Sequence, residues 1–150
     1  MKNAILSILL LLSISNANAQ LDVVHESNTK LIGQHVYMKV SQIELNKNLK
    51  NETFTFTYKD AEYLKLILWK DFTIKNQTSL DELYALCTKM ISEKSQNSVD
   101  ILLPNESKLI VSYSKTWKGI TFTIINSVGI KSSTAPPMKQ KKLDSLFGKS

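Results

Sequence analysis

The segment from Ser79 to Lys94 constrains the fold most, because its pattern is that of an amphipathic helix. The Ser79 hydroxyl and the Glu82 carboxylate are spaced for a capping box at the first turn. Apolar side chains recur at intervals of three and four residues along one helical face: Leu80, Leu83, Tyr84, Cys87, Met90 and Ile91. The pattern predicts a helix that buries a wide apolar face against a sheet.

Alternating apolar and polar residues before this helix predict three strands. The first runs from His35 to Leu45 with a change of phase, which we interpret as a bulge. The second covers residues 54–58 and is followed by a turn that contains Asp60 and Glu62. The third, residues 63–74, is apolar on both faces, which is typical of a central strand.

The pattern resumes after the helix with three further strands, residues 99–103, 109–117 and 120–124. Lys118-Gly119 is expected to close a two-residue hairpin. A second helix is predicted from Pro136 to Phe147, capped by Ser133 or Thr134, since proline is favoured in a first turn.

The element order βββαβββα predicts an α+β fold: one antiparallel sheet of about six strands in two three-strand meanders, with both helices packed on one face. Two similar tripeptides, Asn51-Glu52-Thr53 and Asn105-Glu106-Ser107, are separated by as many residues as the expected caps Ser79 and Ser133. The side chains between these points match poorly, so a duplicated half stays a hypothesis.

The start of the chain has the pattern of an export signal. Lys2 precedes an apolar run from Ala4 to Ile14, and the small residues Ala17 and Ala19 stand just before Gln20. The run is too short to cross a bilayer, so no transmembrane anchor is expected after processing.

Three ranges follow from these patterns: a signal peptide over residues 1–19, a flexible polar leader over residues 20–33, and a single α+β domain over residues 34–150. The predicted location is secreted or periplasmic, after cleavage between Ala19 and Gln20. With one cysteine, no intramolecular disulfide can form.

The positive charge of the chain comes entirely from lysine. It carries 19 lysines, no arginine and a formal net charge of +6. Specific nucleic-acid recognition is not expected, because arginine makes the commonest base-specific contacts. The lysine bias suggests a bacterial source, and the partner is expected to be an unknown protein or an envelope polymer.

Residues suited to catalysis are few. Cys87 stands in the middle of the apolar helix face, where a buried thiol is inert. His25 and His35 have no second ligand at metal spacing, so neither a metal site nor another cofactor is expected. An enzyme would need a site assembled from distant residues, with Cys87 and His35 as the candidate pair.

Two groups of residues could serve binding. Tyr63, Trp69 and Trp117 are expected on the sheet face that the helices leave open, where they could contact a ligand. The C-terminal lysines could contact an anionic surface: Lys139, Lys141 and Lys142, with Lys149.

The leading hypothesis is an exported, non-catalytic binding or accessory domain, because the sequence specifies a fold clearly but contains no recognisable catalytic motif. The alternatives are the enzyme with Cys87 and His35, and an adhesin that binds anionic envelope polymers through its lysines.

Cleavage is expected between Ala19 and Gln20, because the signal peptidase needs small side chains at Ala17 and Ala19. Intact-mass spectrometry of the exported protein should give a chain that starts at Gln20. A product that keeps residues 1–19 and stays with the membrane would show that the segment is an anchor.

Overall fold

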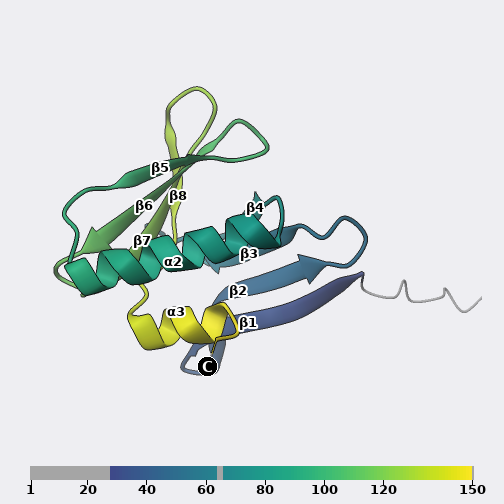
Figure 1. Cartoon of the computed structure of the whole chain (residues 1–150), viewed down its shortest axis with the longest axis horizontal. Helices are drawn as coiled ribbons and strands as arrows, with labels where there is room; N and C mark the ends of the chain where they lie inside the picture. Colours follow the sequence, from purple (N-terminus) through teal and green to yellow (C-terminus); the bar gives the residue numbers. More distant parts are fainter. Residues whose placement is uncertain (1–27, 64–65, 150) are drawn as a thin grey trace, which may run out of the picture.

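Two antiparallel sheets and two helices form the part of the chain that this computed structural model describes, residues 28–63 and 66–149 (Figure 1). The first sheet contains β1 (Thr29–Tyr37), β2 (Val40–Asn48), β3 (Phe54–Lys59) and β4 (Trp69–Ile74), in that order. Helix α2 (Gln77–Glu93) follows. The second sheet contains β5 (Val99–Leu102), β6 (Lys108–Ser114), β7 (Gly119–Ile125) and β8 (Lys131–Thr134), again in order, and α3 (Gln140–Leu146) ends the fold.

The α+β class is confirmed, but the number and grouping of the strands differ from the prediction. Each half forms a four-strand meander in a sheet of its own, instead of three strands of a common sheet. The predicted signal peptide lies outside the described residues, as does most of the predicted leader. Strand β1 begins at Thr29, inside the range for which a leader is predicted.

The strand predicted from His35 to Leu45 is in fact two strands joined by a hairpin turn. The predicted bulge is present on β2, just after the turn: the register shifts between the pairs His35–Ile43 and Val36–Ser41, so Gln42 is the extra residue. Met38 and Lys39 both adopt positive φ values, 49° and 65°, and the chain reverses there to pair β1 with β2. This backbone conformation usually selects glycine or asparagine. Because a methionine and a lysine occupy the turn, the residue types there do not indicate a hairpin.

The predicted central strand over residues 63–74 is wrong as well. Of its described residues, only those from Trp69 to Ile74 form a strand, β4, and β4 lies at an edge of the first sheet. Leu66 and Ile67 are 60% and 64% exposed. The apolar residues on both faces therefore reflect an exposed apolar segment before an edge strand, and not burial on two sides.

The central helix is confirmed, but its cap lies three residues earlier than predicted. The Asn76 side chain accepts a hydrogen bond from the Ser79 amide at 2.9 Å, so Asn76 is the N-cap and the Ser79 side chain is not. At the other end Lys94 is left-handed, and its amide reaches the carbonyls of Ile91 and Met90. The buried face consists of Leu80, Leu83, Cys87 and Met90.

The second helix begins at Gln140, and its predicted caps belong to strand β8 instead. The Ser133 and Tyr58 hydroxyls share a buried hydrogen bond of 2.5 Å, and the Thr134 amide donates to the Asp60 carboxylate at 3.3 Å. Both residues therefore connect the two sheets, a long-range role that a local cap pattern cannot reveal.

The two helices do not cover one face of a common sheet, as expected. Helix α2 packs against β6 and β7 of the second sheet, and α3 packs against β1 and β2 of the first (Figure 1). Between the sheets, Phe56 stacks on Phe72 with ring centres 4.7 Å apart, and Phe122 meets both rings edge-on. The buried apolar residues form one continuous cluster.

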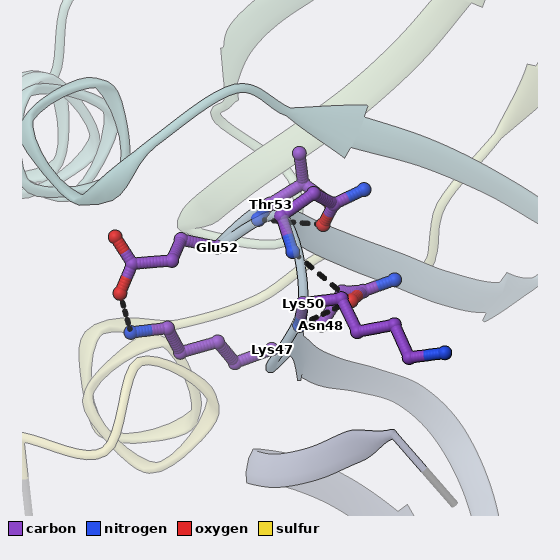
Figure 2. A network of polar contacts seen from close by, with 6 residues as sticks. Lys47, Asn48, Lys50, Glu52 and Thr53 are labelled. Atoms are coloured by element: carbon purple, nitrogen blue, oxygen red, sulfur yellow. Dashed lines mark hydrogen bonds and ion pairs between the residues drawn. The ribbon is translucent and has the colours of Figure 1, made fainter.

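The two similar tripeptides do form similar turns. In the β2–β3 loop, the Thr53 amide donates to the Asn51 side chain at 3.2 Å while Glu52 adopts a positive φ of 56°, and Lys47 pairs with Glu52 (Figure 2). In the β5–β6 loop, the Ser107 amide and the Asn105 side chain repeat this bond at 3.3 Å, with Glu106 at 63°. The two halves are therefore alike in these two loops. They differ at the expected caps, because Ser79 lies in α2 and Ser133 in β8.

Replacing the cap residue tests the start of α2. Asn76→Ala should lower the free energy of unfolding by about 1 kcal/mol, because it leaves the Ser79 amide without its acceptor. Ser79→Ala should change it by less than about 0.5 kcal/mol, since the Ser79 hydroxyl takes no part in the cap. Urea denaturation of the two variants gives both values. If Ser79→Ala lowered the free energy of unfolding more than Asn76→Ala, the result would support the predicted capping box with Ser79 as the cap.

Candidate functional site

A cavity of ≈ 580 Å³ lies where the β1–β2 hairpin and α3 meet the second sheet. Its lining comes from four separate parts of the chain: the hairpin, the end of β3, the turn between β6 and β7, and the segment from residue 136 into α3. The apolar part of the wall is made by Tyr37, Ala61, Trp117, Pro136 and Pro137. The polar part is made by His35, Gln42, Lys59, Asp60 and Lys142.

Strand geometry places the polar and aromatic groups of the hairpin on the cavity side. His35 and Tyr37 stand two residues apart on β1, so their side chains leave the same face. Lys59 is the last residue of β3. Trp117 belongs to the four-residue turn that joins Ser114 to Gly119, and its amide donates to the Ser114 hydroxyl at 3.3 Å.

Two glycines allow the backbone contacts that shape the cavity. A Cβ atom at Gly33 would lie 2.1 Å from the Ser145 carbonyl oxygen, so α3 rests directly on the backbone of β1. A Cβ atom at Gly119 would lie 2.4 Å from the Met138 carbonyl oxygen, where Met138 and Ile120 exchange two backbone hydrogen bonds of 2.8 Å. These contacts fix Lys142 and the two prolines beside the cavity.

Asp60 is a buried carboxylate with spare hydrogen-bonding capacity. Its side chain is 1% exposed, and one oxygen accepts the amides of Glu62 and Thr134 at 3.1 and 3.3 Å. The other oxygen has no hydrogen-bond partner in the part of the chain that the structure describes. Buried polar atoms without a partner are uncommon in folded proteins. The bond to Glu62 fits the turn role predicted for Asp60, and the bond to Thr134 adds a second role between the sheets.

The other charged groups at this cavity are positive. Neither Lys59 nor Lys142 forms an ion pair with another described residue, whereas Lys131 pairs with Glu62 and Lys149 with Asp81. Burial lowers the pKa of His35 below its usual 6.5, and the positive charge of Lys142 lowers it further. The cavity thus disfavours a third positive charge while it is empty of anions.

The structure divides each of the two residue groups that the sequence analysis proposes for binding, because only one member of each lines the cavity. Trp117 lines the cavity, while Tyr63 and Trp69 are half exposed outside it, Trp69 opposite Lys59 in the β3–β4 ladder. Lys142 lines the cavity too, whereas Lys139 and Lys141 are exposed and do not.

Sequence reasoning missed several of the cavity residues. The sequence pattern predicts a continuous strand through Tyr37 and a first helical turn at Pro136 and Pro137, whereas the structure places all three at the cavity. The adjacent prolines were the one available signal, since two in succession favour an extended segment over a helix start.

The candidate pair for catalysis is not assembled at this cavity. His35 lines it, but Cys87 lies at 0% exposure on the core face of α2. Burial raises the pKa of the Cys87 thiol to about 12, so the thiol stays protonated at neutral pH. Among residues 28–63 and 66–149, no three His, Cys, Asp or Glu side chains are grouped to hold a metal ion.

A second hollow of ≈ 510 Å³ lies between β4 and β5, which are edge strands of their sheets. Its lining is mainly aliphatic and includes Ile74, Leu102 and Pro104, with Lys75 as its one charged residue. It contains no aromatic side chain and none of the residues that the sequence proposed for binding.

Comparison with known proteins yields no relative for this chain: no family model, curated protein or solved structure matches it. In the described ranges, neither helix combines the length and apolar character needed to cross a membrane.

Alkylation measures the state of the thiol directly. In the native protein at neutral pH, Cys87 should react with iodoacetamide no faster than the protein unfolds, because it is buried and its pKa is about 12. In urea it should react at the rate of a free cysteine. Fast labelling of the folded protein would support the alternative hypothesis of an enzyme that uses Cys87 and His35.

Proposed function

We propose that this chain is an exported, non-catalytic binding domain whose ligand occupies the cavity beside Tyr37 and Trp117. The observation that carries the proposal is the exposure of these two aromatic side chains, 58% and 62%, on the wall of one cavity. Aromatic rings that line a concave site can bury a large apolar area against a ligand while their polar tips stay hydrated.

The shape of the lining suggests a ligand with a flat apolar body. Pro136 and Pro137 offer rigid apolar surfaces in the same lining as Trp117, and Ala61 adds a small one. Gln42 supplies a hydrogen-bonding amide on the same wall. An unknown protein or an envelope polymer could present such a group, so both expected partner classes remain proposals.

A binding role also agrees with the chemistry of the cavity. None of its lining residues is a cysteine, serine or threonine, and Tyr37 is the one lining residue that carries a hydroxyl. The lysine-mediated adhesin would instead use Lys139 and Lys141, which are exposed outside the cavity. It needs no apolar ligand, so the two functions can be separated by substitution.

The neutral fluorophore N-phenyl-1-naphthylamine is a suitable probe, because its emission rises when it enters an apolar site. Trp117→Ala should weaken its binding by about tenfold or more, since the loss of a large buried contact is worth at least 1.4 kcal/mol. A fluorescence titration of the purified protein measures the affinity.

Two matched variants act as controls. Trp69→Ala removes a half-exposed tryptophan outside the cavity, and Leu102→Ser alters the second hollow. Both should keep the affinity of the parent protein. If Trp117→Ala binds the probe as tightly as the parent, this cavity is not the binding site. Binding of an anionic polymer that is unaffected by Trp117→Ala but lost on Lys141→Gln would favour the adhesin.

A further inference from the structure

Three basic side chains from three different elements line the same cavity. His35 comes from β1, Lys59 from the end of β3 and Lys142 from α3. No described residue forms an ion pair with either lysine. This convergence is a product of the tertiary fold, because the three residues are far apart in the sequence.

The groups that line the cavity together with His35 come from α3, the end of β3, β2 and β1 itself. Lys142 on α3 and Lys59 on β3 are positive, and Asp60 beside Lys59 is the one acid in the lining. Strand β2 contributes the neutral Gln42, and β1 itself contributes Tyr37. One carboxylate oxygen of Asp60 already accepts two backbone amides, which offsets part of its charge.

We propose that this cavity selects an anionic ligand and holds it more tightly once His35 is protonated, with Lys59 and Lys142 as the permanent positive charges. The inference rests on the proposed function and adds the class of the ligand and its regulation by pH. The ligand would carry a sulfate, phosphate or carboxylate group on a flat apolar body, the group facing the three basic side chains and the body facing Trp117.

The sign of the pH effect follows from linkage. In the free protein, burial and Lys142 keep the pKa of His35 below 6.5. A bound anion favours the imidazolium and so raises this pKa. Affinity must then increase as the pH falls through the pKa of the bound state, and must level off below the pKa of the free state.

Two probes measure the contributions of the anionic group and of the apolar body to binding separately. 8-Anilinonaphthalene-1-sulfonate carries a sulfonate on the same skeleton as neutral N-phenyl-1-naphthylamine. Between pH 8 and pH 5 the parent protein should bind the sulfonate about tenfold more tightly, which corresponds to a rise of one unit in the pKa of His35. Binding of the neutral probe should change by less than about twofold.

Matched variants assign the effect to residues. His35→Gln should remove the pH dependence of sulfonate binding. Lys142→Gln should weaken binding of the sulfonate probe by about fivefold to tenfold at both pH values. Lys141→Gln, which changes an exposed neighbour outside the cavity, should leave that binding unchanged. Thermal melting checks that each variant is folded.

The parent protein provides a readout that needs no variant. In NMR titrations, a saturating amount of the sulfonate should raise the pKa of the His35 imidazole by about one unit, and the neutral probe should not. The inference is overturned if both probes bind equally and without pH dependence, if the His35 pKa stays fixed, or if His35→Gln keeps the tenfold change. Those outcomes leave the binding function intact, whereas failure of both probes to bind removes the function itself.

Discussion

The structure depends on a hydrophobic core that both halves of the chain must build together. Phe56 and Phe72 from the first sheet meet Phe122 from the second, and Phe147 at the end of α3 lies 5.5 Å from Phe56, between ring centres. Each helix packs against the sheet of the opposite half. Neither half can bury its apolar face alone, so the four strands on each side are held to a single arrangement.

The cavity results from the packing of each helix against the sheet of the opposite half. Because α3 crosses back to the first sheet, Lys142 is placed at the same wall as His35, and the segment before α3 places two prolines beside Trp117. The close backbone contacts at Gly33 and Gly119 leave no room for a side chain, so these segments can approach this closely only because both positions are glycine. Asp60 joins the sheets at the same point through Thr134.

The chemistry of this wall supports the proposed binding function. Aromatic and proline surfaces supply contact area, and basic side chains supply charge, but the thiol is on the core face of another element. Burial has opposite consequences for the two titratable groups: it keeps Cys87 protonated and it makes His35 harder to protonate. The thiol therefore stays protonated at neutral pH, whereas His35 is the group whose protonation we propose to respond to a bound anion.

Local periodicity in the sequence determined the α+β class, the helix over residues 79–93 and the strand from Phe54 to Tyr58, because each buries one face at a regular spacing. Residue type, and not periodicity, indicated His35 as a catalytic candidate, Trp117 as a ligand contact and Lys142 as a contact for an anionic surface. Tertiary structure alone decided that these three share a cavity, since the contacts that join them cross between separate segments. The hairpin at Met38–Lys39 and the edge position of β4 were likewise decided by pairing partners, which local patterns do not encode.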